Sequence, residues 1–459
     1  MVLQRACWEY GGMTYDESDV LARGRYRHAV EAAIWGMPAV NYQLMRETMT
    51  EGATNEFVYW SKLLDWRNQT LTPNPDLIYY MAFFDTHDGP VVVEIPGESD
   101  GQALNGSICS LWQVPLEDVG HFGVDAGRGG KYLILPPDFD EPVPEGYIVL
   151  PCETYGSYAL LRSVLAEGTQ EALDRGLELC RRIRVYPLAE ASDPPETKAR
   201  DLHGDIVDTT IPYDLRFYEL LHRVIQNEPL LARDRAFEQM LASIGIRKDE
   251  PFDPSPADVA LLEDAISEAH AWLKAEYEQS FDAFFDGAKW FFPGRADFTE
   301  SQRDGFDAHP EGYPYPNRGV IYHMAFIGIR RLGIGQFYLV NLRDSDGDIF
   351  SSSASYRMRV PAGVPVSQFW SVTMYDAATH AFIRGNTKYS VSSQTPGLAT
   401  NDDGTVDIFF APHTRPDQHA NTIETGSSTS FELMFRFYGV GPEVMTKQWA
   451  LSDVVRTSH

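Results

Sequence analysis

Two polar residues lie in a loop that prolines make rigid. The segment Pro73-Asn-Pro-Asp76 places Asn74 between two prolines and Asp76 just before a β-like run that contains Tyr79. Proline fixes its own φ and restricts the preceding residue, so this loop should be extended and preorganised. We predict Asp76 as a general base or cation ligand, with Asn74 and Tyr79 binding substrate. Alternatively, the Asn and Asp side chains satisfy backbone groups of the turn.

A second polar group follows the strand-like segment that ends at residue 112. Trp112 and Gln113 are adjacent there, and His121 comes after an acidic loop. An indole face buries a large apolar area and an amide fixes orientation, so Trp112 and Gln113 are predicted to bind substrate together with His121. The alternatives are a core position for Trp112 and a hydrogen-bonded loop position for His121.

A third group lies in the C-terminal third of the chain. Asp376 follows Tyr375 in a β-like run, and Lys388 and Tyr389 are adjacent in a segment expected to be a strand. An ammonium group stabilises a phenolate, but neighbours in a strand point to opposite faces. We therefore predict Lys388 as the charge partner of Asp76 or an oxyanion stabiliser, with Tyr389 and Asp376 completing the catalytic set. The alternative is an ion pair of Lys388 with Asp376 that serves only structure.

Acidic turns and histidines give weak metal signals. Asp344-Ser-Asp-Gly-Asp348 and Asn401-Asp-Asp-Gly404 resemble calcium loops, but they lack the EF-hand order and are more simply hairpin turns. His413, Asp417 and His419 fit no standard zinc spacing. No Gly-x-Ser-x-Gly elbow and no dinucleotide-binding glycine fingerprint is present. We predict no cofactor and no metal ligands, with calcium at the acidic turns as the minor alternative.

The hydrophobic pattern changes from alternating to helical and back along the chain. Strands are expected at 77–85, 89–95, 102–112, 131–135, 146–150, 338–342, 356–360, 369–375, 406–411 and 431–438. Helices are expected at 18–36, 156–166, 168–184, 214–226, 231–243 and 256–280. Gly36-Met-Pro38 should end the first helix, and Ser255 with Pro256 should begin the last.

Composition limits the classes of partner. The 459 residues contain 66 acidic and 38 basic side chains, a net charge of −28, which disfavours binding to nucleic acid or anionic membranes. None of the four cysteines forms a Cys-x-x-Cys pair, and the first residues lack the apolar core of a secretory signal. We therefore expect a cytoplasmic protein with cysteines in a reducing compartment.

Several of these segments together resemble a known pair of domains. The motif Pro-Asn-Pro-Asp followed by tyrosine at 73–79, the Tyr375-Asp376 pair and the Asn386-Thr-Lys-Tyr389 stretch are similar to the DUF1254 and DUF1214 families, two domains of unknown function that usually occur in this order. The resemblance covers most of the chain and implies a fold but no activity. Relatives of this type look like oligomers, so we expect a homodimer or homotetramer.

One segment departs from the family pattern. Many relatives carry Asn-Trp-Leu-Pro before their last strands, where this chain reads Asn421-Thr-Ile-Glu424. If that loop lines a pocket, the smaller side chain leaves a roomier or more polar site. Glu424 is then an added acidic group and a candidate substrate-binding residue.

Together these observations predict an α+β, mainly β, chain. Two antiparallel β-sandwich or jelly-roll-like domains are expected, at 1–205 and 319–459, joined by a mostly helical connector at 206–318. The leading functional hypothesis is a small-molecule hydrolase acting on a polar organic substrate in a cleft between the β-domains. The alternatives are a non-catalytic carbohydrate or polar-ligand binding protein and an oligomeric scaffold, because sandwiches host all three.

Overall fold

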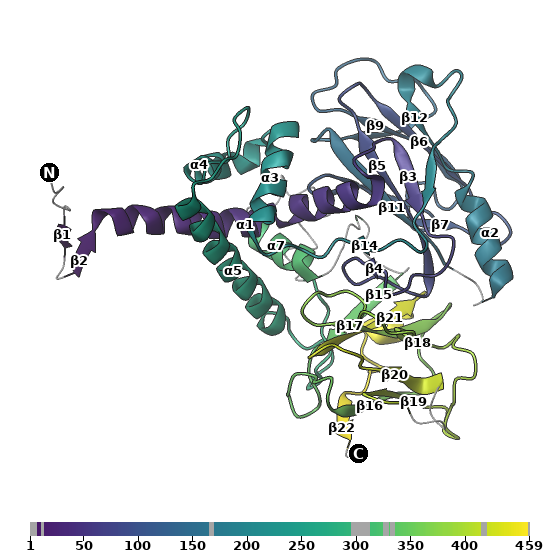
Figure 1. Ribbon diagram of the computed structural model, residues 1–459. Helices are drawn as coiled ribbons and strands as arrows, with labels where there is room; N and C mark the ends of the chain where they lie inside the picture. The colour runs from purple at the N-terminus through teal and green to yellow at the C-terminus, as the bar shows by residue number, and fades with distance from the viewer. Residues whose placement is uncertain are drawn as a thin grey trace.

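The chain builds two β-units, one in each half, and a group of helices around a long first helix (Figure 1). The computed structural model describes residues 7–10, 13–164, 169–294, 313–324, 330, 336–414 and 420–457. Most paired strands in this part of the chain run antiparallel, and helices and strands are both abundant. The protein is therefore of the α+β class, as the sequence predicts.

The N-terminal β-unit consists of two sheets with a common core. Their strand orders are β10-β9-β6-β12 and β13-β3-β5-β11-β7-β8. Residues such as Ile78 and Tyr80 of β5 and Val91 and Val93 of β6 are buried in that core. The strands are β3 (Glu56–Tyr59), β5 (Leu77–Asp85), β6 (Val91–Pro96), β7 (Leu104–Ser110), β8 (Pro115–Val119), β9 (Gly129–Leu135), β10 (Ile148–Pro151), β11 (Gly156–Val164), β12 (Arg184–Pro187) and β13 (Ala199–Asp201).

The C-terminal β-unit repeats this plan with two four-stranded sheets. Their strand orders are β15-β21-β17-β18 and β20-β19-β16-β22. Phe431, Leu433, Phe435 and Phe437 of β21 point into the core of this unit, so the alternating residues of β21 lie on its outer face. The strands are β15 (Gln336–Asn341), β16 (Ser355–Val360), β17 (Trp370–Asp376), β18 (Ser390–Ser392), β19 (Val406–Ala411), β20 (Thr422–Glu424), β21 (Phe431–Tyr438) and β22 (Val454–Thr457).

The helices pack mainly on α1, which contacts α3, α4, α5 and α7. The longer helices are α1 (Glu17–Thr50), α2 (Gln170–Cys180), α3 (Leu215–Asn227), α4 (Arg235–Ser243), α5 (Pro256–Gln279) and α7 (Tyr315–Met324). The short elements are η1 (Leu188–Glu190), η2 (Ala232–Asp234), α8 (Pro442–Met445) and the strands β1 (Cys7–Tyr10), β2 (Met13–Asp16), β4 (Asn68–Gln69) and β14 (Val207–Asp208). In Figure 1, α1 runs from the β1–β2 hairpin through the helices to the N-terminal β-unit.

Two predicted elements are wrong. The first helix does not end at Gly36-Met-Pro38 but continues to Thr50, because its buried surroundings compensate for the proline. Pro38 also serves as an acceptor, since its carbonyl oxygen receives the side-chain amide of Gln113 at 2.9 Å. Residues 156–166 were expected to be helical, but 156–164 form strand β11 in the middle of the six-stranded sheet.

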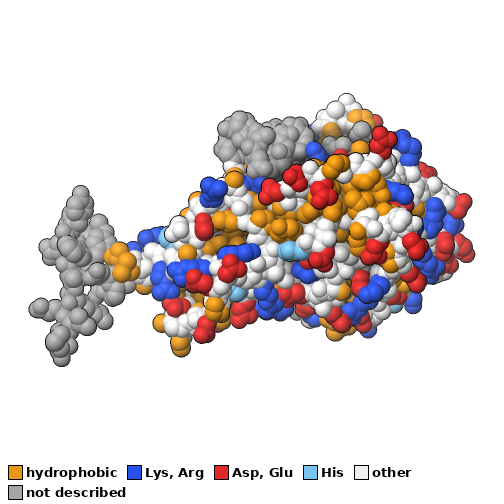
Figure 2. Space-filling view, turned by 90° about the horizontal axis from the view of Figure 1, so that it is seen from above, with side chains coloured by type: hydrophobic (Ala, Val, Ile, Leu, Met, Phe, Trp, Pro, Cys, Tyr) orange, Lys and Arg blue, Asp and Glu red, His pale blue; other side chains and the backbone are white. Residues whose placement is uncertain are grey.

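The surface carries mixed charge. Figure 2 shows acidic and basic side chains interspersed around a group of hydrophobic side chains in the middle of the visible face. Among the described residues, no helix is both long enough and apolar enough to cross a bilayer. Among the described residues, Cys109, Cys152 and Cys180 are buried and form no disulfide, and burial raises the pKa of each thiol.

Candidate functional site

A pocket lies between the outer faces of the two β-units. On the N-terminal side, Arg162 of β11 pairs in register with Tyr79 of β5. On the C-terminal side, Tyr338 of β15 pairs with Arg436 of β21. The pocket, here called the central pocket, has a volume of about 80 Å³ and is closed by α1 and the segment from Trp60 to Pro73. Paired residues on a sheet share a face, so the register alone brings both arginines to this pocket.

Arg436 is buried and held by neutral groups. Its Nη1 donates to Thr373 Oγ1 at 2.8 Å, and its Nη2 donates to the Thr72 carbonyl oxygen at 3.0 Å and to the Tyr375 hydroxyl at 2.5 Å. The guanidinium also lies 5.5 Å from the centre of the Tyr338 ring, at cation–π distance. Every one of these partners is uncharged, so Arg436 makes no direct ion pair, although the buried carboxyl group of Asp76 lies close enough to act on its charge.

Arg162 faces the same tyrosine from the other unit. Its Nη1 donates to Gln336 Oε1 at 3.0 Å and to the Tyr338 hydroxyl at 3.2 Å, while its Nε is buried without a hydrogen-bond partner. Within the part of the chain that the structure describes, no carboxylate oxygen lies within 4.0 Å of either guanidinium. Two enclosed cations without a paired carboxylate are costly. The central pocket is therefore electropositive in a strongly acidic protein.

Asp76 lies behind the pocket wall rather than in it. Ser390 Oγ donates to Asp76 Oδ1 at 2.9 Å, and Asp76 Oδ2 is buried with no hydrogen-bond partner among the described residues. Burial raises the pKa of this carboxyl group, although Ser390 and the charge of Arg436 act in the opposite direction. Asn74 supports the turn, since its Oδ1 accepts the Asp76 backbone amide at 2.9 Å and its Nδ2 contacts the Tyr438 hydroxyl. Only Tyr79 of these three predicted residues lines the pocket.

The other predicted catalytic residues have separate partners. Asp376 Oδ1 accepts the backbone amides of Ala378 and Thr379, at 2.8 and 3.2 Å, and so closes a turn. Lys388 and Tyr389 precede β18, so the expectation that both lie within a strand is wrong. Lys388 Nζ contacts the Ala420 carbonyl oxygen, and burial lowers its pKa to about 8. The Tyr389 hydroxyl accepts the Trp66 amide at 2.9 Å and donates to the Asn386 carbonyl at 2.5 Å.

Gln113 organises one wall of the pocket from behind. Its Nε2 donates to Asn41 Oδ1 at 2.7 Å, its Oε1 accepts the Tyr158 hydroxyl at 2.9 Å, and its backbone has a φ of 59°. Asn41 lines the central pocket, so Gln113 positions a pocket residue without entering the pocket. Trp112 is buried with its ring 4.6 Å from that of Trp35.

The two remaining predicted binding residues lie outside the pocket. His121 is exposed, and its backbone amide donates to Asn105 Oδ1 at 3.1 Å. Glu424 is exposed at the end of β20, and its Oε1 accepts the Thr414 amide at 3.0 Å. Neither is part of the pocket lining.

The acidic turns show turn geometry. Asp344 Oδ1 accepts the backbone amides of Asp346 and Asp348, each at 3.0 Å, and the Gly404 amide donates to the Asn401 carbonyl at 2.9 Å. In the described ranges, no group of three or more His, Cys, Asp or Glu side chains is placed to hold a metal ion. The predicted loop residues Asp417 and His419 lie outside the described residues.

A buried chain of titratable side chains crosses from the helices to the C-terminal β-unit. Glu432 Oε1 contacts His380 Nδ1 at 2.9 Å, His380 Nε2 lies 3.4 Å from His323 Nε2, and His323 Nδ1 contacts the Tyr213 hydroxyl. The Tyr277 hydroxyl donates to Glu432 Oε2 at 2.8 Å. Burial, then the neighbouring His380, lowers the pKa of His323 well below its ordinary value. We refer to Tyr213, His323, His380 and Glu432 as the histidine chain.

The comparisons with known proteins match both halves of the chain. Residues 54–187 match a protein family of unknown function, DUF1254, and residues 335–442 match a second one, DUF1214. The chain belongs to this two-domain DUF1254/DUF1214 family. The matched ranges contain Tyr79 and Arg162 in the first domain and Tyr338 and Arg436 in the second, so both domains supply the central pocket.

The chain is similar to two solved structures. The VPA0106 protein from Vibrio parahaemolyticus is 19% identical, with 95% of this chain and 100% of that chain covered at a TM-score of 0.57. An uncharacterised protein from Burkholderia cenocepacia is 12% identical over 96% of this chain and 94% of its own, at a TM-score of 0.41. No curated protein matches at a significant level. At these identities, the first of these structures supports the arrangement of the elements only.

Proposed function

We propose that this protein binds a small organic anion with a carboxylate group in the central pocket. The observation that carries the proposal is the pair Arg162 and Arg436, which face one pocket from two domains. Their hydrogen-bond partners among the described residues are neutral. A carboxylate would supply the missing counter-charge, and guanidinium groups match its geometry better than an ammonium does.

The rest of the lining limits the size and character of this ligand. Met45, Met49, Leu64, Met81 and Met434 form apolar walls. A volume of about 80 Å³ exceeds the space that one water needs, and it suits a short organic acid. The polar residues Asn41, Asn68, Thr70 and Thr209 provide further hydrogen-bonding groups at the edges. A short aliphatic carboxylate fits this combination of charge and apolar surface.

The test compares propionate with its neutral analogue propionamide by isothermal titration calorimetry. Propionate should bind and propionamide should bind at least tenfold more weakly, because only the anion compensates the arginines. Arg162→Met and Arg436→Met should each weaken propionate binding by about tenfold or more. Arg359→Met is the matched control, since Arg359 pairs with Asp407 on the surface of the C-terminal unit. Equal affinity for both probes, or unchanged binding in both arginine variants, would contradict the proposal.

Hydrolysis in the same pocket is the catalytic alternative that one observation favours. Burial raises the pKa of Asp76 although Arg436 lowers it, and a carboxyl group with a raised pKa can act as a general acid or base; from its place behind the pocket wall Asp76 would have to act through a residue of the lining. Binding without turnover needs no such group. We also infer a jelly-roll-like C-terminal unit, a proposal supported by its two four-stranded sheets.

A further inference from the structure

A second cavity lies between α3 and α4. Its volume is about 470 Å³, and its walls come from the end of α3, the connection to α4, α4 itself and residues 246–250. Leu230, Leu231 and Leu241 provide apolar surface, and Trp112 forms part of one wall. This α3–α4 cavity has the size range and the apolar lining of small-molecule sites.

Two buried polar atoms in its wall residues lack hydrogen-bond partners. Asp234 is 1% exposed, and its Oδ1 accepts the Trp35 indole N–H at 2.8 Å, but its Oδ2 has no donor among the described residues. Trp112 is 3% exposed, and its indole N–H has no acceptor there. Buried polar groups are nearly always hydrogen-bonded, so two such atoms at one cavity require an explanation.

The neighbouring charges do not satisfy Asp234 Oδ2. Arg233 Nε lies 3.8 Å from Asp234 Oδ2, beyond hydrogen-bond distance, and the Arg233 guanidinium is paired with Glu153. Arg318 also acts on Asp234 electrostatically. Lys248 Nζ is bound to the carbonyl oxygens of Gln226 and Glu228, at 2.5 and 3.3 Å. Asp234 therefore presents one carboxylate oxygen that a ligand can use.

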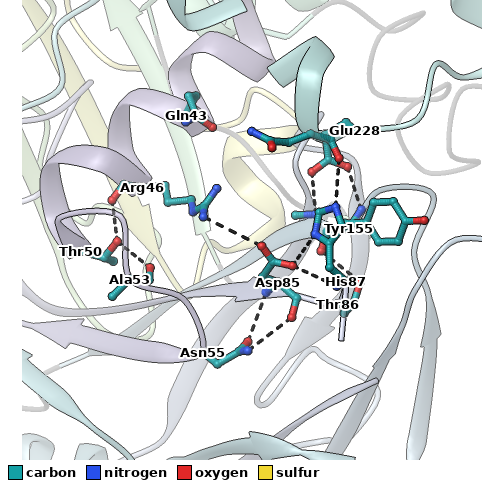
Figure 3. A network of polar contacts seen from close by, with 12 residues as sticks. Gln43, Arg46, Thr50, Ala53, Asn55, Asp85, Thr86, His87, Tyr155 and Glu228 are labelled. Carbon is teal, nitrogen blue, oxygen red and sulfur yellow. Dashed lines mark hydrogen bonds and ion pairs between the residues drawn. The ribbon is translucent and has the colours of Figure 1, made fainter. Parts of the chain in front are cut away.

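Glu228, the other buried acid of the cavity wall, is already occupied. Figure 3 shows its carboxylate directed at the backbone beside Tyr155, where it accepts the amides of Tyr155 and Gly156, each at 2.8 Å. Glu238 on α4 lines the same cavity and is exposed to solvent. The lining thus contains the buried Asp234 and the exposed Glu238, and its acidic side chains outnumber its two basic ones, Arg247 and Lys248.

We propose that the α3–α4 cavity binds an organic ammonium cation with an apolar body. The ammonium donates to Asp234 Oδ2, and the apolar body packs on the leucines. The indole of Trp112 supplies an aromatic face for the cation. A hydroxyl or ether oxygen on the ligand would accept a hydrogen bond from the Trp112 indole N–H. Burial raises the pKa of the Asp234 carboxyl group, so an incoming positive charge favours its ionised form.

The probes are 2-phenylethylammonium, its neutral analogue 2-phenylethanol and its charge-reversed analogue 3-phenylpropionate, each titrated by calorimetry at pH 7. The ammonium should bind at least tenfold more tightly than the alcohol, and the carboxylate should show no binding that Asp234 variants alter. Asp234→Asn keeps an oxygen for Trp35 and removes the charge, so it should weaken ammonium binding by about tenfold or more. Glu263→Gln, on the exposed face of α5, is the matched control.

A second variant avoids dependence on the buried aspartate. Leu230 is 39% exposed at the cavity wall, and Leu230→Lys adds a repelling charge there with little effect on the core. It should also weaken ammonium binding. Equal affinity for the ammonium and the alcohol, absence of ammonium binding, or full binding in both variants would overturn the proposal. Arg436→Met should not change ammonium binding, so this site and the central pocket can fail independently.

Discussion

Arg436 combines two roles at the scale of single residues. Its hydrogen bonds to Thr72 and Thr373 join the loop of one unit to the sheet of the other. Its charge faces the pocket, with Asp76 as the carboxylate that acts on it electrostatically. An arginine held by neutral groups keeps its full charge available to a ligand. The same residue therefore stabilises the contact between the units and creates the site between them.

Asp76→Asn tests whether Asp76 opposes anion binding or performs catalysis. Asparagine retains the oxygen that accepts the Ser390 hydroxyl, while the negative charge near Arg436 is removed. We expect propionate affinity to rise, on the order of twofold to tenfold, because the arginine loses a competing charge. Calorimetry measures this change. A large loss of affinity, or of an ester-hydrolysing activity with binding intact, would instead identify Asp76 as a catalytic group.

The candidate site was predictable at some residues and not at others. Pro73 and Pro75 indicate a rigid loop, and the structure does place Tyr79, which follows that loop, in the pocket wall. Arg162 was missed because residues 156–163 are buried or half-buried on both faces of the sheet, so this strand shows no alternation of polar and apolar residues. Arg436 was missed because a single arginine in an apolar strand has no local signal. Its neighbour Tyr338 lies 98 positions earlier in the sequence, and only the sheet register brings the two together.

At the scale of elements, α7 is held against α1 by a close helix crossing at Gly319. A Cβ atom at this glycine would lie 2.8 Å from the Ile34 carbonyl oxygen of α1. Helix α7 carries His323 of the histidine chain and Tyr322, whose hydroxyl donates to the Gln113 carbonyl at 2.8 Å. This crossing therefore positions both His323 of the histidine chain and the hydrogen bond from Tyr322 to Gln113.

Gly319→Ala should destabilise the protein by about 1–3 kcal/mol, because the added methyl group overpacks the crossing. Gly24→Ala on α1 is the matched control, since nothing lies within 4 Å of its Cβ position. The control should raise the free energy of unfolding by about 0.5–1 kcal/mol through helix propensity. Denaturant unfolding of both variants measures these changes. A Gly319→Ala protein as stable as the control would show that α7 can move away from α1 without cost.

The histidine chain predicts how stability depends on pH. His323 is buried with a lowered pKa, and burial lowers the pKa of its neighbour His270 to about 4. Below about pH 6.5 the unfolded chain takes up protons that these folded residues do not, so stability should fall as the pH decreases. Tyr213, Tyr277, Lys274, His380 and Glu432 are the titratable groups that face the two histidines.

In the His323→Gln variant, the unfolded chain has one fewer histidine that takes up a proton. Between pH 7.5 and 5.5 the variant should lose about 1.4 kcal/mol less unfolding free energy than the unmodified protein. Urea midpoints of both proteins at several pH values provide the measurement. The variant is less stable overall if hydrogen bonds are lost, so the slope is the informative quantity. An unaltered slope would mean that His323 takes up its proton in the folded protein over the same pH range as in the unfolded chain.

At the scale of the whole molecule, the pattern of strands predicted most of the β-structure. The expected strands 77–85, 406–411 and 431–438 coincide with β5, β19 and β21, because alternating or β-branched residues and turn signals mark them. The helix at 256–280 was also predictable from Ser255, whose side chain accepts the Asp258 amide. The continuation of α1 past Pro38 was not predictable, because burial of the helix in the folded protein outweighs the helix-ending signal of Gly36-Met-Pro38. The domain boundaries at 205 and 318 stay predictions.

The oligomeric state also stays a prediction, and the shape of the chain suggests how to test it. The β1–β2 hairpin lies at the far end of α1, away from the two β-units (Figure 1). Hydrophobic side chains also gather on one face (Figure 2). We expect a homodimer or homotetramer, and light scattering at micromolar concentration should give a multiple of 51.7 kDa. Deletion of residues 1–16 should reduce the mass to that of a monomer if the hairpin makes the contact. A monomeric full-length chain would contradict the expectation.

The central claim is that Arg162 and Arg436 bind a carboxylate between the two β-units. The most direct measurement is a crystal structure of the protein soaked with propionate and, separately, with propionamide. We predict difference density for a carboxylate within hydrogen-bond distance of at least one of the two guanidinium groups, and none for the amide at the same soak concentration. Only ordered water in the central pocket, or propionate bound solely elsewhere, would contradict the account.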